Sequence, residues 1–175
     1  TNRILSALPA AEFASLEPQL SRVALDSGQT VHRQGDLIDH VYFVESGFLS
    51  TSTVLSDGQP LEVGLIGSEG LVGFCVVLGG RTSFAETTCQ IGGQAYRMPA
   101  EALREAFAKS RALHDLILGF VLNFQVQVTQ TAACNAHHPL EQRLVRWLLA
   151  AHDRSSGASL SLTQDLIAGM LGVRR

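Results

Sequence analysis

The chain has 175 residues, of which 46% are hydrophobic and 17% are charged, and its net charge is −3 at neutral pH. This composition supports a packed core and excludes an intrinsically disordered chain. The slight negative charge argues against a surface that coats nucleic acid without specificity, but it leaves room for a small basic element.

Residues 1–20 carry apolar side chains at three- to five-residue steps, which predicts helical structure. From Val23 to Met98, glycines separate short β-rich segments, which is typical of a sandwich or barrel. Asp57-Gly58 between two apolar runs indicates a hairpin turn, because glycine accepts a positive φ. The strands that we predict are TVHR (30–33), HVYFVES (40–46), FLSTSTVL (48–55), LEVGLI (61–66), ETTCQI (86–91) and QAYRM (94–98).

After Pro99 the pattern becomes helical. It predicts a short helix over 100–109 and a long helix over 111–136, about 39 Å at 1.5 Å per residue. Apolar and small residues recur along the long helix at alternating four- and three-residue steps, which is the pattern of a coiled-coil seam. We therefore expect a dimer interface formed by Leu113, Ile117, Phe120, Phe124, Gln127 and Thr131.

A second stripe on the long helix, formed by Leu116, Leu122 and Val126, lies on other faces. One face can thus cover the β-domain while another meets a partner helix. Burial of one wide stripe within a single chain remains an open alternative. His138-Pro139 ends the helix, because the residue before a proline is driven out of the helical conformation.

The remaining segment reads as two helices with a linker between them. Residues 140–152 form an amphipathic pattern, and DRSSGAS follows as a linker or turn. In the last segment Thr163 suits a helix N-cap and Gly172 suits a helix stop.

Three stretches resemble the Crp/Fnr family of bacterial transcription regulators. They are HRQGDLIDHVYFVESGFLS (32–50), similar to the early β-roll; CNAHHPLEQRLVRWLLAAHDR (134–154), similar to the end of the dimer helix and the next helix; and LSLTQDLIAGMLGVRR (160–175), similar to the first part of a helix-turn-helix. The order of the three stretches along the chain makes the resemblance specific.

The resemblance implies an α+β fold with three parts. Residues 1–110 would form a jelly-roll β-barrel of the cyclic-nucleotide-binding type, 111–138 a dimerisation helix, and 139–175 the start of a winged helix-turn-helix. We expect a truncated DNA-binding domain, because the recognition helix of the family would follow Arg175.

The implied partners are a second copy of the chain, double-stranded DNA and RNA polymerase. We expect DNA contacts from Thr163, Gln164, Arg174 and Arg175. The two arginines suit phosphate contacts, which position a protein on DNA rather than read its sequence.

Members of the family that bind cyclic AMP carry a Gly-Glu pair, a short helix, and an arginine followed by a hydroxyl residue. In EGLVGFCVVLGGRTSFAETT (69–88) Phe74 follows Gly73. Phe74 cannot accept the hydrogen bond of a ribose hydroxyl. The family's arginine corresponds either to Arg81 or, when the following strand is aligned, to Glu86, and neither alignment completes the site.

We therefore expect no tight cyclic AMP binding and no resident cofactor, with room for another small-molecule effector. The candidate effector residues are Gly73, Phe74, Cys75, Arg81, Thr82 and Ser83.

Catalysis and metal binding find little support. The chain has no nucleophile elbow, P-loop or HExxH motif, and it lacks the His-x-His pair of cupin enzymes. Haem ligation by His32, Cys75 or Cys89, as in one branch of the family, remains open. The iron–sulfur branch uses N-terminal cysteines, which residues 1–74 lack.

Location can also be predicted. The three cysteines are widely spaced and form no CxxC pair, so we expect free thiols in a reducing compartment. We see no signal peptide and no uninterrupted apolar run of roughly 18 residues. The expected protein is a cytoplasmic regulator without a membrane partner, and the alternative is a sensory module that does not bind DNA.

Overall fold

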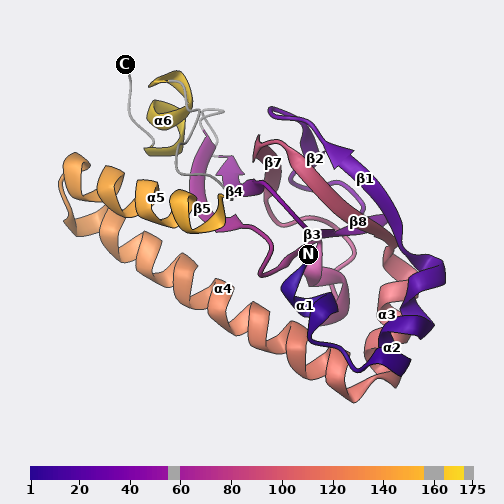
Figure 1. Ribbon diagram of the computed structural model, residues 1–175. Helices are drawn as coiled ribbons and strands as arrows, with labels where there is room; N and C mark the ends of the chain where they lie inside the picture. The colour runs from indigo at the N-terminus through magenta and orange to yellow at the C-terminus, as the bar shows by residue number, and fades with distance from the viewer. Residues whose placement is uncertain (55–59, 156–163, 172–175) are drawn as a thin grey trace.

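The computed structural model describes residues 1–54, 60–155 and 164–171. Within these residues a β-sandwich of two four-stranded antiparallel sheets forms the centre of the chain (Figure 1). The first sheet has the order β1-β8-β3-β6: Ser21–Leu25, Gly93–Pro99, His40–Val44 and Leu71–Val72. The second sheet has the order β2-β7-β4-β5: Thr30–His32, Glu86–Ile91, Phe48–Val54 and Pro60–Ile66. Eight strands in two packed sheets are the arrangement of a jelly roll.

The inward faces of the two sheets form the main core. Strands β3 and β4 are rich in β-branched and aromatic residues, which favour strands and fill the space between sheets. Val41, Phe43, Val44 and Leu49 have no exposed surface.

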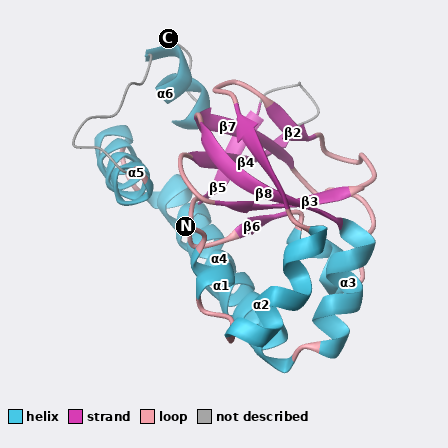
Figure 2. Ribbon diagram, turned by 45° about the vertical axis from the view of Figure 1, so that its right-hand side comes forward, coloured by secondary structure: helices cyan, strands magenta, loops and turns pink. Residues whose placement is uncertain are grey.

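Helices close the sandwich at one end and along one side (Figure 2). Those at the end are α1, α2 and α3, and the long helix α4 runs along the side. The α-helices are α1 Arg3–Ser6, α2 Ala10–Leu16, α3 Ala100–Lys109, α4 Arg111–His137, α5 Leu140–Arg154 and α6 Gln164–Leu171. The described residues also include the short 3₁₀ helices η1 Glu17–Gln19 and η2 Phe74–Leu78.

The chain reverses at the end of α4. His138 adopts an extended conformation ahead of Pro139, and α5 then runs back toward the sandwich (Figure 1). There α5 and α6 cover the outer face of the second sheet and form a separate hydrophobic cluster with it. The buried members of this cluster are Phe48, Leu65, Trp147, Ala151 and Leu171.

Most of the predicted elements are confirmed to within about two residues, and the predicted strand over 86–91 matches β7. The predicted short helix over 100–109 matches α3, and Pro99 is both the last residue of β8 and the N-cap of α3. The strands β1 and β6 were not predicted, and β6 has only two residues, too few to show a periodicity. The predicted turn at Asp57-Gly58 and the helix signals at Thr163 and Gly172 lie outside the described residues.

Candidate functional site

A small cavity inside the sandwich marks the place where an effector was expected. Four of the six candidate effector residues line it: Gly73, Phe74, Cys75 and Ser83. The other lining residues come from β4, β5, β7 and the loop before β7: Thr51, Ile66, Phe84, Ala85 and Thr87. The cavity measures about 10 Å³. One water molecule needs roughly 10–15 Å³, and pockets for small ligands usually have about 300–1,000 Å³, so the site is effectively full.

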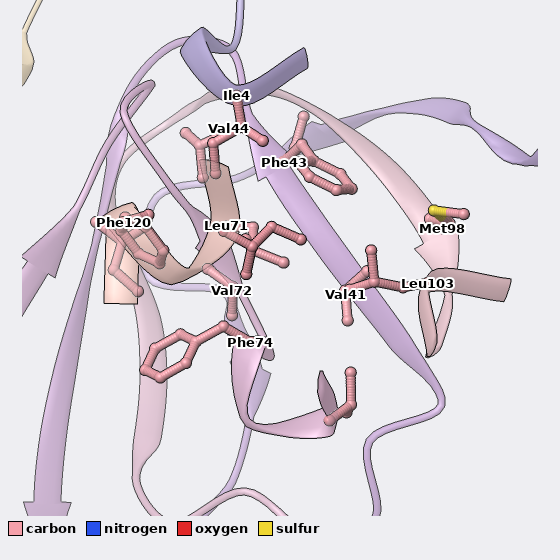
Figure 3. Close-up of a cluster of buried hydrophobic side chains, with 14 of the residues drawn as sticks. Ile4, Val41, Phe43, Val44, Leu71, Val72, Phe74, Met98, Leu103 and Phe120 are labelled. Carbon is pink, nitrogen blue, oxygen red and sulfur yellow. The ribbon is translucent and has the colours of Figure 1, made fainter. Parts of the chain in front are cut away.

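Phe74 is the side chain that fills this space. Its ring is only 7% exposed and lies edge-on to Phe84 at 5.8 Å, Phe120 at 5.6 Å and Phe124 at 5.3 Å between centroids. Figure 3 shows the rings of Phe74 and Phe120 on the same side of the buried cluster. Edge-to-face pairs at these distances are favourable beyond their buried area. Phe74 thus joins the effector position to α4 directly.

The other two candidate effector residues lie elsewhere. Arg81 is exposed and lines a separate hollow of about 380 Å³ beside α3, together with Glu101 and Arg104. Thr82 is exposed and forms an isolated β-bridge with Leu37. Backbone hydrogen bonds fix this course of the loop: the Ile38 amide donates to the Arg81 carbonyl at 3.0 Å. Arg81 therefore belongs to a different part of the surface from the cavity.

Glu86 does not reach the cavity either. Ala85 and Thr87 line the cavity on either side of it, and strand alternation turns its side chain to the opposite face of β7. Of the two alignments considered for the family's arginine, neither places a side chain here. No described residue that lines the cavity is charged, so the cavity offers a phosphate no counterion.

The thiols of Cys75 and Cys89 and the imidazole of His32 are buried in the interior of the sandwich. Burial raises the pKa of Cys75, and it raises the pKa of Cys89 to about 11. The Cys89 thiol donates to the Ile91 carbonyl at 3.3 Å. His32 has a pKa lowered by burial, and its Nε2 lies 3.0 Å from the His40 carbonyl oxygen. The described residues contain no cluster of three or more His, Cys, Asp or Glu side chains that would hold a metal.

The predicted coiled-coil seam faces the chain's own sandwich. Leu113 and Ile117 have no exposed surface, and Phe120, Phe124 and Thr131 are 5–7% exposed. Gln127 continues the same face: its side chain accepts from the Leu65 amide at 2.7 Å and donates to the Leu65 carbonyl at 3.0 Å. All six side chains are thus buried or hydrogen-bonded within one chain.

An apolar stripe remains exposed on the opposite face of α4. Leu118, Leu122 and Val126 are 37%, 66% and 61% exposed and follow one another at four-residue steps. Leu122 and Val126 belong to the second stripe identified in the sequence. By length and composition alone α4 is also long and apolar enough to cross a membrane, although its other apolar face packs on the sandwich.

Hydrogen bonds and an ion pair connect α5 with the sandwich, with α4 and with α6. The Trp147 indole donates to Oε1 of Glu62 on β5 at 2.8 Å. Arg154, near the end of α5, pairs with Glu69 at 2.7 Å. Arg143 donates to the side chain of Asn135 on α4 at 3.0 Å and to the Leu171 carbonyl on α6.

Glu62 and Trp147 were not among the predicted site residues. The available signal was modest: a single carboxylate within an apolar strand, and the only tryptophan of the chain on an amphipathic helix. Of the predicted DNA contacts, Gln164 is the exposed first residue of α6. Thr163, Arg174 and Arg175 lie outside the described residues.

The fold is shared with solved regulators. The c-di-GMP responsive global regulator CLP from Xanthomonas campestris has a TM-score of 0.74 and 20% identity, with 95% of this chain and 86% of that chain covered. A transcriptional regulator assigned to the crp/fnr family from Eubacterium rectale has a TM-score of 0.76 and 16% identity, with 98% and 81% covered.

A third structure resembles only part of the chain. The regulatory subunit of a cAMP-independent protein kinase A from Trypanosoma brucei has a TM-score of 0.56 and 18% identity, with 65% of this chain and 40% of that chain covered.

The amino-acid sequence of the sandwich matches a known protein family. No curated protein sequence matches the chain significantly. Residues 22–110, which run from β1 through α3, match the family described as the cyclic nucleotide-binding domain. The chain therefore belongs to the cyclic nucleotide-binding domain family, with a fold similar to that of Crp/Fnr regulators.

Proposed function

We propose that the chain is a dimeric, DNA-binding transcriptional regulator of the Crp/Fnr type whose sandwich does not respond to cyclic AMP. The observation that carries the proposal is the extent of the structural likeness. The two bacterial regulators cover 95–98% of this chain, so the likeness extends beyond the sandwich into α4 and α5, whereas the kinase subunit covers 65%.

The sandwich supports the second part of the proposal. Phe74 occupies the cavity, and no described lining residue can neutralise a phosphate. A cyclic nucleotide would need both space and a positively charged or amide-rich cradle. An effector of another kind would have to displace Phe74 or bind elsewhere.

The dimer would form through the exposed stripe of α4. Leu118, Leu122 and Val126 present an apolar line about two turns long on the face that the sandwich leaves free. Ridges of residues four apart on two such helices can interdigitate, with the helix axes crossing at about −50°. A two-fold dimer would place two helix-turn-helix units on a palindromic site.

A gel shift with the protein expressed from its whole gene tests DNA binding. The probe is the region upstream of that gene, and an unrelated duplex of equal length is the control. We expect a preference for the upstream region, with affinity that falls steeply as salt rises. Equal affinity for both duplexes at every salt concentration would favour the sensory module without DNA binding.

The same assay tests the two arginines at positions 174 and 175. Replacing both with alanine should weaken binding to all duplexes alike and lower the salt slope by about one unit for each lost phosphate contact. Cyclic AMP at millimolar concentration should leave the affinity unchanged, because the cavity is filled.

A further inference from the structure

Glu62 is a carboxyl group buried between the sandwich and α5. It is 5% exposed, and Trp147 is 3% exposed. The indole Nε1 donates to Glu62 Oε1 at 2.8 Å, and Oε2 has no hydrogen-bond partner in the described part of the chain. Trp147 belongs to the second hydrophobic cluster, together with Phe48, Leu65 and Ala151. A carboxylate in such a place loses its hydration with only one hydrogen bond in return.

The charged groups that face Glu62 do not neutralise it by contact. From α5, Arg146 and Arg154 attract the carboxylate, but neither lies within ion-pair distance among the described residues. Arg154 is already paired with Glu69, and Nε of Arg146 has no partner there.

The strands and α6 add no positive charge. From β4, Ser52 stands opposite Glu62, and beyond it on β7 lies Glu86, which is half-buried and of the same sign. The described side chains of α6 that pack here, Ile167, Met170 and Leu171, are apolar.

This environment favours the protonated acid. Burial raises the pKa of Glu62 from 4.5 to about 8, and it outweighs the hydrogen bond from Trp147 and the attraction of Arg146 and Arg154, which lower it. If α5 left the sheet, water would reach the carboxyl and its pKa would fall back toward the ordinary value. The docked state therefore holds one proton more than the undocked state between those two values.

We infer that Glu62 is a proton-operated latch: a proton on its carboxyl group holds α5 and α6 against the outer face of the second sheet, and loss of that proton releases both helices. The direction of the pH dependence follows from the linkage between proton binding and docking. A group with a raised folded-state pKa stabilises the docked state at low pH, and this contribution is lost as pH rises toward the docked value. The docking constant should fall up to about tenfold for each pH unit between roughly 4.5 and 8, and then level off.

The consequence for regulation rests on the proposed function. If α6 begins a helix-turn-helix, the latch would fix its position relative to the sensor sandwich at acidic and neutral pH. Alkaline pH, or any partner that stabilises the ionised carboxylate, would free it. Docking itself is a property of the described chain and does not depend on DNA binding.

Trp147 provides a direct readout, because it is the only tryptophan of the chain. The experiment follows its emission maximum and its quenching by acrylamide from pH 5.5 to 9.5, with far-UV circular dichroism as the record of global folding. We expect a blue-shifted, shielded indole at pH 6. Near pH 8 the emission should shift to the red and quenching should increase severalfold, while the dichroism stays constant.

The matched variants are Glu62→Gln and Glu86→Gln. Glu62→Gln keeps an oxygen that accepts from Trp147 and removes the ionisation, so its indole should stay shielded across the pH range. Glu86→Gln removes a carboxylate from the same face of the same sheet and should keep the wild-type transition, because Ser52 places Glu86 and Glu62 on one side.

Three results would overturn the latch. One is a wild-type indole whose shielding does not change between pH 6 and 9.5. The second is the same transition in Glu62→Gln, and the third is loss of the whole fold over the same pH range. If Glu62→Gln does not fold, hydrogen exchange of the wild-type α5 amides at pH 6 and 9, corrected for intrinsic rates, decides the matter. The latch requires faster exchange in α5 at pH 9 with unchanged protection in β3 and β4. A negative gel shift would leave this result untouched, so the two proposals fail separately.

Discussion

Phe120 of α4 stands directly over the backbone of Gly70. A Cβ built on Gly70 would lie 2.1 Å from Cε2 of the ring. One turn later Phe124 lies over Gly64 of β5, where a built Cβ would be 2.8 Å from its Cε2. At these two glycines the absence of a side chain lets the phenyl rings of α4 pack directly against the backbone of the sandwich. In this position both rings also contact Phe74.

Gly70→Ala tests this close approach. The added methyl group has to displace the Phe120 ring, and overpacking of this kind typically costs about 1–3 kcal/mol. We expect a loss of about 2 kcal/mol in the free energy of unfolding, measured by denaturant titration. The control is Gly119→Ala, in the middle of α4 with no atom near its Cβ position, which should stabilise the helix by up to about 1 kcal/mol. Equal effects of the two substitutions would contradict the close packing.

Phe74→Ala should empty the effector position. Loss of a buried phenyl ring typically costs about 3–5 kcal/mol, and an apolar cavity of this kind binds small apolar molecules such as benzene. We expect calorimetry to detect benzene binding to the variant and not to the wild type. Neither protein should bind cyclic AMP or cyclic GMP, because no described lining residue is charged. Micromolar or tighter binding of either nucleotide to the wild type would refute the assignment of Phe74 as a plug.

The exposed stripe of α4 predicts the dimer contact. Leu122→Glu or Val126→Glu should shift the sedimentation coefficient from dimer to monomer and leave the circular dichroism of the protomer unchanged, because both side chains point away from the sandwich. The control is Leu78→Glu, at an exposed leucine of η2, which should remain dimeric.

Phe120→Glu should behave differently from the stripe variants. Its side chain is buried against the sandwich, so the charge would lower the melting temperature of the protomer itself. A stable monomeric Phe120→Glu protein, with Leu122→Glu still dimeric, would return the interface to the predicted seam.

The substitution Gln127→Glu should make the free energy of unfolding depend on pH. Its amide serves as both donor and acceptor for the backbone of Leu65 on the edge strand β5. In Gln127→Glu a carboxylate oxygen would face the Leu65 carbonyl, and such a loss typically costs about 1–3 kcal/mol. Protonation restores a donor, so the loss should shrink as pH falls through the raised pKa of the new acid. Denaturant titrations at pH 5 and 8 check this, and Gln125→Glu on the solvent face should change stability by less than about 0.5 kcal/mol at both.

The sequence by itself determined most of the elements and their class. Segments rich in β-forming residues between glycines located the β4, β5 and β7 strands, and the long helix was predicted to end at His138 because Pro139 follows. These features are local: each depends on a few neighbouring residues, so the pattern of the chain carries them.

Only the tertiary structure decided which side of α4 faces inward and which residues enter the cavity. Both stripes of α4 are apolar, and the choice between them rests on Gly64 and Gly70, which lie about 50–60 positions earlier in the chain and accept the phenyl rings. In the same way, the sequence left open whether Arg81 or Glu86 corresponds to the family's arginine, and only the loop path and the register of β7 showed that neither side chain reaches the cavity. Glu62 and Trp147 are 85 positions apart, so no local pattern shows that one buries the other. Contacts of this kind depend on how surfaces distant in sequence fit together, and periodicity contains no information about that fit.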